Sequence, residues 1–507
     1  MGRLSQYWCR RKGQLATLLT GGVPRGDGQR LRRLVVVPLF VGVIAALGSA
    51  GLFALLGLVT NLLLGELAGH HPARTALEGG GGAVGALGFG LWPVLLIAGA
   101  GAAVAATLCR ALAPEARGHG TDAAIETAHE RPLGIRPRVP VVKLLASALT
   151  IGSGGSAGTE GPAAQISAAA GSVFARRARL SPEEARTAVV IGLAAGVGAI
   201  FTAPFGAALM ACEVLYRRGM DAGLLPRALI ASVTAWLVFG LFFGFGPLFG
   251  RNASAGAAFG WVDLGLYLIL GLLCGLHGRL YVWAFYRVHD FAEKRPRRWI
   301  WQIGLPVAGA VAAAGIGMAV PGVLGTGYGM LQSFADGTPL AATSLTLLLL
   351  LPWAKTLATV LTVGTGGSGG LFGPALVVGG ALGASVWAVA ERAGLPVAGP
   401  LSYTVVGMAA LLGPVARAPI GVLIMAVETV GAAALLPPAL LGTGVSILVV
   451  QGTTLYRSQR DSPPGSATLP SARSIAPRSH DRSQPVPESE VSGSGPGPSP
   501  CRDSAVS

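Results

Sequence analysis

Two long segments of this chain are copies of one another. The first reads PVVKLLASALTIGSGGSAGTEGPAAQISAAAG at residues 140–171, and the second reads PWAKTLATVLTVGTGGSGGLFGPALVVGGALG at residues 352–383. They align without a gap and agree at about half of their positions, including Lys143 with Lys355. A charged residue matched inside apolar sequence indicates duplication rather than shared composition. The fold must therefore be built from two related units.

A second pair of matching segments follows these copies. APFGAALMACE ends at Glu213 and APIGVLIMAVE ends at Glu428, and in each the glutamate comes nine residues after the proline. The repeated units are therefore expected at about 90–220 and 300–435. Because Glu213 and Glu428 recur in both copies, we interpret them as structural acids that accept hydrogen bonds from backbone amides.

The chain is too apolar to be a soluble protein of several domains. Of its 507 residues, 52% are hydrophobic and 12% are charged, and the mean hydropathy is +0.60. Runs such as 34–65 and 91–109 are long enough to cross a hydrocarbon core of ~30 Å. These features predict an all-α protein that crosses the membrane several times, and we expect it in the plasma membrane.

The basic residues predict which side of the membrane each end of the chain occupies. The net charge is +15, and the arginines gather in clusters between apolar runs, as in 216–227 and 287–299. Such clusters are typical of cytoplasmic loops, so they favour a membrane orientation over a nucleic-acid partner. Both termini are therefore expected in the cytoplasm.

Composition also divides the chain into three parts. Residues 1–33 are expected to form a basic cytoplasmic segment, which is too long and polar for the start of a secretory signal. Residues 34–456 are expected to form the transmembrane domain. Residues 457–507 are rich in serine and proline and poor in large apolar residues, which predicts a disordered cytoplasmic tail without a regulatory domain.

The glycine-rich part of each copy interrupts its apolar sequence. GSGGSAGTEGP occupies 152–162, and the apolar run that follows, 163–175, is too short to cross a membrane. Interrupted helices of this kind surround binding sites in transporters with internal repeats. We expect one helix to end at the glycine run and another to begin just after Gly-Pro, since proline is tolerated in a first turn. The free amides at such a start favour an anion.

Glu160 is the feature that the two copies do not share, because Phe372 stands at its place in the second copy. A carboxylate inside a membrane segment costs about 2.5–3.5 kcal/mol, so its presence indicates a purpose or a compensating interaction. The repeated architecture does not require an acid there. A cation site built from carbonyl groups would need several acids nearby, and the sequence has few. We therefore interpret Glu160 as a functional residue.

These motifs together resemble those of the CLC family of chloride channels and chloride/proton antiporters. GSGGSAGTEGP resembles the family's G-[KR]-E-G-P segment, GGLFGP at 369–374 its G-x-F-x-P segment, and GHGTD at 118–122 its G-S-G-x-P segment. The resemblance runs from about residue 34 to Tyr456 and includes ARAPIGVLIMAVE. It implies an all-helical bundle of two inverted-topology repeats, whose broken helices meet at a midplane anion site, usually in a homodimer with one pathway per subunit.

The resemblance also implies a role for each matching residue. Glu160 matches the gating glutamate, whose carboxylate occupies an anion site when ionised and moves aside when protonated. Tyr456, in GTTLYRS, matches the tyrosine whose hydroxyl touches the central anion, and His119 falls where many members have a serine at the inner end of the pathway. The implied anion-binding residues are His119, Gly158, Glu160, Gly161, Leu371, Phe372 and Tyr456.

Three departures from the family's pattern bear on transport. Thr159 stands where many relatives have a basic residue, which weakens electrostatic attraction at the outer end. His119 replaces the serine and Asp122 the proline of the third motif, which leaves the preference among small anions open. Val214 falls where proton-coupled members carry an inner glutamate, so the usual proton relay is missing. This favours channel-like or proton-uncoupled transport, with chloride/proton antiport as the alternative.

The predicted function is transport of chloride or a similar small anion, with protons acting at the gate, and no enzymatic activity is expected. A rival from another class is an intramembrane serine protease, because GGSG at 366–369 fits a G-x-S-G pattern and His277 could be the base for Ser368. Against it, Ser156 occupies the same place in the first copy, and one nucleophile needs no twin. No cofactor and no metal are predicted, since the five cysteines show no metal-ligand spacing.

Overall fold

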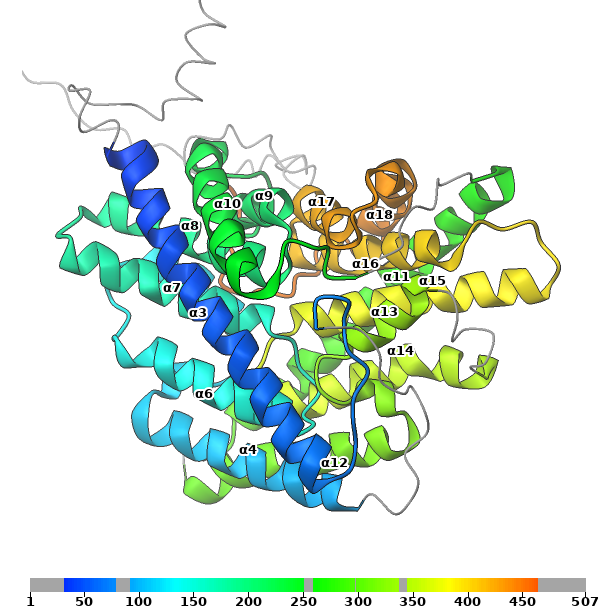
Figure 1. The fold of residues 1–507 in the computed structure, drawn as a ribbon, viewed down its shortest axis with the longest axis horizontal. Helices are drawn as coiled ribbons and strands as arrows, with labels where there is room; N and C mark the ends of the chain where they lie inside the picture. The colour runs from blue at the N-terminus through cyan, green and yellow to red at the C-terminus, as the bar shows by residue number, and fades with distance from the viewer. Residues whose placement is uncertain (1–31, 79–91, 250–258, 297, 337–343, 464–507) are drawn as a thin grey trace, which may run out of the picture. The chain divides into compact units, whose positions relative to one another are not determined.

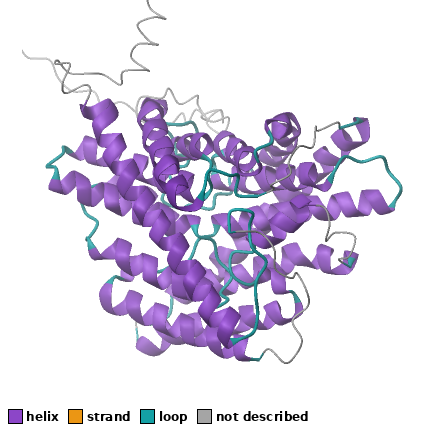
Figure 2. Cartoon of the chain, in the orientation of Figure 1, coloured by secondary structure: helices purple, strands orange, loops and turns teal. Residues whose placement is uncertain are grey.

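The computed structural model describes residues 32–78, 92–249, 259–296, 298–336 and 344–463. Within these ranges the regular elements are helices, and strand pairing is limited to two isolated bridges (Figure 2). Most of the expected basic N-terminal segment and of the expected tail lie outside the described residues. The all-helical fold class predicted by the sequence is confirmed.

The first half of the chain contains eight α-helices among the described residues. Two π-helical turns flank the first helix, at Arg32–Val36 and Asn61–Leu67. The α-helices are α3 (Val37–Thr60), α4 (Pro93–Leu112), α5 (Thr121–Glu130), α6 (Arg138–Gly152), α7 (Glu160–Arg177), α8 (Pro182–Ile200), α9 (Pro204–Glu213) and α10 (Leu225–Phe243).

The helices of the second half have the same order. They are α11 (Trp261–Glu293), α12 (Trp299–Ala319), α13 (Tyr328–Asp336), α14 (Leu345–Thr359), α15 (Phe372–Arg392), α16 (Pro400–Ala416), α17 (Pro419–Val430) and α18 (Leu436–Val450). A π-helical turn at Val360–Gly364 continues α14 towards the second glycine run. Figure 1 shows the two halves side by side.

Helix packing shows that the duplication is wider than the two segments compared in the sequence. The pair α3 and α10 packs together as α11 and α18 do, α7 packs on α8 as α15 does on α16, and α8 packs on α10 as α16 does on α18. Equivalent helices of the two halves are also in contact, most extensively α4 with α12 and α9 with α17, while α7 meets α15 near their starts. The inverted repeats therefore run from α3 to α10 and from α11 to α18, beyond the expected 90–220 and 300–435.

Eight helical stretches among the described residues are long and apolar enough to cross a membrane. Others are too short for that, including α16 and α17, and yet they are apolar and buried. Short buried helices of this kind can end inside the protein, where other helices rather than lipid surround their termini. The stretches that could span are Arg33–Leu67, Pro93–Leu112, Ala222–Phe243, Trp261–Glu293, Trp299–Ala319, Leu345–Gly364, Phe372–Arg392 and Ala433–Val450.

The helices after the glycine runs start slightly earlier than the sequence predicts. Helix α7 begins at Glu160 and α15 begins at Phe372, so Pro162 and Pro374 lie at the third helical position instead of preceding the helix. Proline is accepted there because amides of the first turn have no partner within the helix. The earlier start makes Glu160 itself the first residue of its helix.

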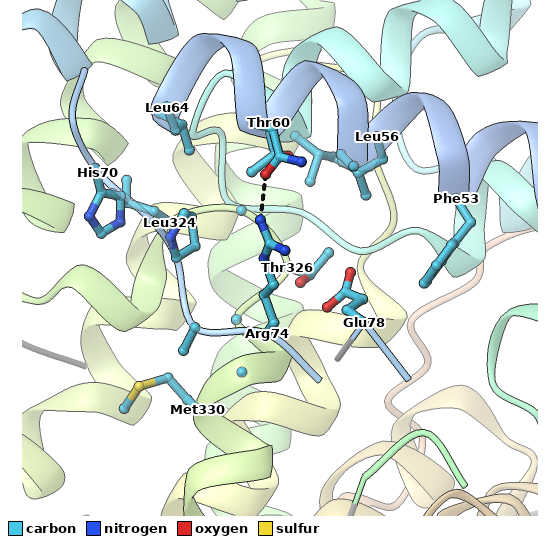
Figure 3. Close-up of a pocket in the computed structure, with 18 of the residues that line it drawn as sticks. Phe53, Leu56, Thr60, Leu64, His70, Arg74, Glu78, Leu324, Thr326 and Met330 are labelled. Atoms are coloured by element: carbon cyan, nitrogen blue, oxygen red, sulfur yellow. Dashed lines mark hydrogen bonds between the residues drawn. The ribbon is translucent and has the colours of Figure 1, made fainter. Parts of the chain in front are cut away.

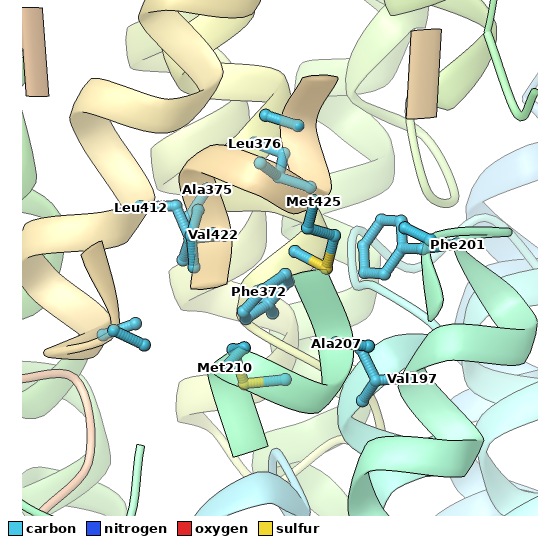
Figure 4. Packing of buried hydrophobic residues seen from close by; sticks show 14 of the residues in the cluster. Val197, Phe201, Ala207, Met210, Phe372, Ala375, Leu376, Leu412, Val422 and Met425 are labelled. Atoms are coloured by element: carbon cyan, nitrogen blue, oxygen red, sulfur yellow. The ribbon is translucent and has the colours of Figure 1, made fainter. Parts of the chain in front are cut away.

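The packed interior joins the two halves around these helix starts. Phe372 lies beside Phe201, with ring centroids 5.6 Å apart, and Met210 and Met425 from the two equivalent helices α9 and α17 pack close to it (Figure 4). All four side chains are almost completely buried. The start of α15 is thereby held by residues from both repeats.

Candidate functional site

The two glycine-rich runs meet in the middle of the protein. Gly158 and Gly370 exchange backbone hydrogen bonds, with N–H···O distances of 2.8 and 2.7 Å. This antiparallel pair of residues brings the start of α7 next to the start of α15. Two helix N-termini, each with amides that have no partner within their own helix and with a positive dipole end, therefore face one region, which is a favourable arrangement for an anion.

The Glu160 carboxylate lies between these two helix starts. Its side chain belongs to α7, is 1% exposed, and accepts a hydrogen bond from the Thr159 hydroxyl at 3.0 Å through Oε1. Through Oε2 it accepts a hydrogen bond from the Gly373 N–H at 3.0 Å. Gly373 is in the first turn of α15, so a carboxylate from one repeat occupies the amide end of the other. The protein itself thus supplies a negative group to this anion-favouring position.

Leu371 and Phe372 form the other side of the same position. Phe372 is 2% exposed and is placed by its contact with Phe201. The Leu371 carbonyl accepts a hydrogen bond from the hydroxyl of Tyr281 at 2.9 Å. Tyr281 is a buried residue of α11 that the sequence analysis missed, because nothing in GRLYVWAFY distinguishes it from an ordinary membrane-helix tyrosine.

His119 and Tyr456 lie together although they are far apart in the sequence. Their ring centroids are 5.9 Å apart, and His119 also packs edge-on against Phe285 at 5.7 Å. Tyr456 is 1% exposed and its hydroxyl lies near the Thr121 side chain, yet it makes no hydrogen bond of ordinary geometry. Nδ1 of His119 is likewise buried without a partner. Buried polar atoms are seldom left unpaired, so two of them in one place point to a ligand.

Gly161 connects this pair of rings to the helix starts. A β-carbon at Gly161 would lie 1.9 Å from the carbonyl oxygen of His119 and 2.8 Å from the Cα of Gly370. The backbone of α7 therefore touches the turn that carries His119. The structure thus brings all the residues that the resemblance implied into one contiguous region.

Each of the two buried lysines of the repeats supports a turn. Lys143 donates to the carbonyl oxygens of Ala116 and Gly118, at 3.0 and 2.6 Å. Lys355 is held in the same way, by two carbonyl oxygens at 2.9 Å in the second repeat. Each ammonium group thus ties a glycine turn to the helix that precedes a glycine run.

Glu213 and Glu428 cap one another's helices. The Glu213 carboxylate, at the end of α9, accepts from the Gly421 N–H at 2.7 Å in the first turn of α17. The Glu428 carboxylate, in α17, accepts from the N–H groups of Phe205 and Gly206 at 3.2 and 2.7 Å in the first turn of α9. These hydrogen bonds support the structural interpretation of both acids, and they join the two repeats.

Replacing Glu213 by alanine should lower stability strongly. The substitution leaves the Gly421 N–H without its charged acceptor in a buried setting, and we expect a loss of about 2 kcal/mol. Thermal unfolding of the purified protein in detergent measures the effect. Glu391 is an exposed acid of α15, so Glu391→Ala is the matched control and should change the thermal unfolding midpoint little. Equal midpoints for the two variants would rule out the capping role.

Val214 directly follows Glu213 and is fully buried. Its carbonyl oxygen accepts a hydrogen bond from Nε2 of Gln459 at 2.8 Å, and the same nitrogen donates to the carbonyl of Ala416 at 3.0 Å. The apolar side chain of Val214 is therefore packed in the interior, and its backbone carbonyl has a hydrogen-bond partner. Gln459 comes from the segment that the sequence assigned to the tail.

The first residues of that expected tail are bound to the transmembrane domain. Arg457 donates to both oxygens of Asp290, at 2.7 and 3.0 Å, and its guanidinium lies 3.7 Å from the ring centroid of Tyr286. Arg460 donates its N–H to the carbonyl of Leu215. Residues 457–463 therefore continue the ordered chain beyond Tyr456, and they fasten the segment that carries this tyrosine.

Ser368 and His277, the two residues of the alternative serine-protease site, are hydrogen-bonded to other residues and not to each other. The Ser368 hydroxyl bonds to Ser147 at 3.0 Å and to the carbonyl of Ala116 at 2.9 Å. Nε2 of His277 bonds instead to the hydroxyl of Thr356 at 2.9 Å. In the other copy, the Ser156 hydroxyl bonds to that of Thr359 at 3.0 Å, which is the counterpart of the contact between Ser368 and Ser147. These serines therefore link the glycine runs to neighbouring helices.

Comparison with known proteins shows which family this chain resembles. A family model described as "Voltage gated chloride channel" matches residues 101–451. A ClcB-like protein of Ralstonia nicotianae is 33% identical over 298 residues, which cover 57% of this chain and 67% of that protein. The H(+)/Cl(-) exchange transporter ClcA of Citrobacter koseri is 30% identical over 383 residues, covering 72% of this chain and 78% of ClcA.

A solved structure shares the fold. The crystal structure of a CLC-type fluoride/proton antiporter superposes with a TM-score of 0.68 at 22% identity, over 86% of this chain and 100% of that one. The match covers both repeats, as expected for a common arrangement of inverted halves. Together with the family match and the identities above, it shows that this chain belongs to the voltage-gated chloride channel family, the CLC family of integral membrane proteins.

Proposed function

We propose that the chain moves chloride or a similar small anion across the membrane, through a pathway that Glu160 gates. One observation carries the proposal: the Glu160 carboxylate binds the Gly373 N–H at the start of α15, where it takes the place of an anion. The pathway runs from His119 and Tyr456, past Leu371 and Phe372, to this carboxylate. Along it, hydroxyl and amide dipoles bind the ion, which keeps binding weak enough for release.

The gate works by competition between the carboxylate and the transported anion. An ionised Glu160 side chain occupies the outer position and repels a second negative charge. Protonation removes that charge, so the side chain no longer competes and an anion can bind the amide. Transport should therefore rise as the solution is made more acidic.

A basic cavity supports entry of anions at the His119 end. It has a volume of about 780 Å³, adjoins Gly118, and is lined by the side chains of Arg110, Arg117 and Arg295 as well as by Glu293. A cavity with an excess of positive charge raises the local concentration of anions. The cavity borders Gly118, the residue before His119, which supports entry of anions at this end of the proposed pathway.

We further propose that anion movement is not coupled to proton movement through this subunit. Val214 is apolar and buried where a proton relay would need an ionisable group. Chloride/proton antiport is the second candidate, because relatives of this chain are named as proton-coupled exchangers and because Glu160 itself can carry a proton. We also propose a homodimer, which is usual in this family, and a position in the plasma membrane with both termini in the cytoplasm, the orientation that the arginine clusters between apolar runs favour.

A gradient experiment separates the two modes. Purified protein is reconstituted into liposomes, a chloride gradient is imposed, and the internal pH is followed together with chloride efflux. We expect chloride efflux without uphill proton movement. Protons driven against their gradient would establish antiport instead, and liposomes without chloride flux above protein-free controls would rule out anion transport itself.

A further inference from the structure

The turn that carries His119 has a counterpart in the second repeat. Residues 118–121 read GHGT and residues 325–328 read GTGY. Each turn precedes a short helix, α5 or α13, and each is held by a buried lysine bonded to the carbonyl of its first glycine, Lys143 to Gly118 and Lys355 to Gly325. All four glycines have positive φ: 74° and 82° in the first turn, 58° and 79° in the second. The two turns are therefore equivalent elements of the inverted repeats.

The last residue of the second turn, Tyr328, places its hydroxyl beside Gly373, the residue whose N–H binds the Glu160 carboxylate. A β-carbon built on Gly373 would lie 2.1 Å from the Tyr328 hydroxyl oxygen and 2.7 Å from Oε2 of Glu160. The hydroxyl and the carboxylate therefore flank the same point above the start of α15. Only a glycine leaves room there for both groups.

Tyr328 has a buried hydroxyl without a hydrogen-bond partner. The residue is 6% exposed, and its hydroxyl oxygen is unpaired. The ring is held between Phe201 and Phe249, with centroid distances of 6.3 and 5.7 Å. Leaving a buried hydroxyl unpaired costs free energy. Because the two phenylalanine rings hold the Tyr328 hydroxyl beside Gly373, we expect this hydroxyl to gain a hydrogen-bond partner when the occupancy of that position changes.

We propose that the Tyr328 hydroxyl binds the transported anion at an outer subsite. When the Glu160 carboxylate leaves Gly373, an anion takes its place on the amide, and the Tyr328 O–H donates a second hydrogen bond to it. Tyr328 is then the outer counterpart of the inner cluster around His119 and Tyr456. The inference rests on the proposed anion transport, and it adds a side-chain donor to a position otherwise formed by backbone amides.

A cavity that borders the same turn leaves space for an approaching ion. It has a volume of about 430 Å³ and is lined by the whole turn except Tyr328, as well as by Arg74 and Met330 (Figure 3). Arg74 points into it and donates to Asn61 at 2.6 Å. A hydrated anion therefore has room next to the turn that carries Tyr328.

Chloride titration calorimetry on the purified full-length protein tests the subsite. The Glu160→Ala variant removes the competing carboxylate, and Tyr328→Phe is then added to remove only the hydroxyl while keeping the ring. A hydrogen bond to a charged group is stronger than a neutral one, so we expect chloride affinity to fall roughly tenfold in the double variant. In the chain that keeps Glu160, Tyr328→Phe should change the affinity much less, because the carboxylate still occupies the position.

Tyr267→Phe is the matched control, since Tyr267 is also fully buried but its hydroxyl donates to Ser402. It should leave chloride affinity unchanged. Equal affinities of Glu160→Ala with and without Tyr328→Phe would overturn the subsite, as would an equal loss in both backgrounds, which would indicate a general structural effect. Absence of chloride binding in Glu160→Ala itself would instead overturn the proposed anion transport.

Discussion

Replacing Glu160 by glutamine is expected to leave anion flux high at neutral pH and to abolish its dependence on pH. The glutamine keeps the shape of the side chain but carries no charge that could compete for the Gly373 amide. Gating by one titrating group changes occupancy by up to about tenfold per pH unit, and the variant should show none of this change. Chloride efflux from proteoliposomes, measured from acidic to neutral pH, gives both values.

Glu391→Gln is the control for this experiment, because it removes a carboxylate from the exposed surface of α15. It should retain the pH dependence of the unsubstituted protein. If Glu160→Gln also retained that dependence, another group would have to be the gate. A silent but folded Glu160→Gln variant would equally contradict the competition mechanism.

Gly161→Ala is expected to destabilise the folded protein by about 3 kcal/mol, the upper part of the range for overpacked interiors. The new methyl group would lie 1.9 Å from the His119 carbonyl oxygen and 2.8 Å from the Cα of Gly370. Both neighbours are backbone atoms, which cannot rotate away as a side chain could. The turn of His119 is held by Lys143, and Gly370 is held by its hydrogen bonds to Gly158. The start of α7 must therefore move away from the turn that carries His119.

The measurements for Gly161→Ala are the thermal unfolding midpoint in detergent and the initial rate of chloride efflux. Both should fall well below those of Gly57→Ala and Gly315→Ala, two helical positions where an added methyl group would meet no atom within 4 Å. Retained transport with an unchanged midpoint in Gly161→Ala would show that the protein does not need this close contact between α7 and the turn that carries His119.

Local patterns in the sequence were sufficient to predict the repeat and its equivalent helix starts. The gapless match of the two glycine runs predicted equivalent helix starts, and the structure has them at Glu160 and Phe372. The recurrence of Glu213 and Glu428 predicted a structural role, and their carboxylates bind backbone amides. These features depend on residue type and spacing within short segments, which is the information that a sequence displays directly.

Contacts between distant segments were beyond this kind of reasoning. The sequence indicated that Glu213 and Glu428 bind amides, but not that each caps the helix of the other. Tyr281 and Tyr328 carry no local signal either, because their importance depends on where Leu371 and Gly373 lie. Nor did the composition of residues 457–463 reveal that this segment is bound to the domain, since Arg457 and Gln459 bind Asp290 and Val214, which are more than a hundred residues away.

By itself, the sequence determined that this is a duplicated, helical membrane protein of the CLC family with one acid that its repeat does not require. Only the tertiary structure decided what that acid touches. The Glu160 carboxylate lies on the Gly373 amide because two glycine runs, more than two hundred residues apart, pair with each other and bring two helix starts together. The physical reason is that motifs are local, whereas an anion site between helix ends is made by packing across both repeats.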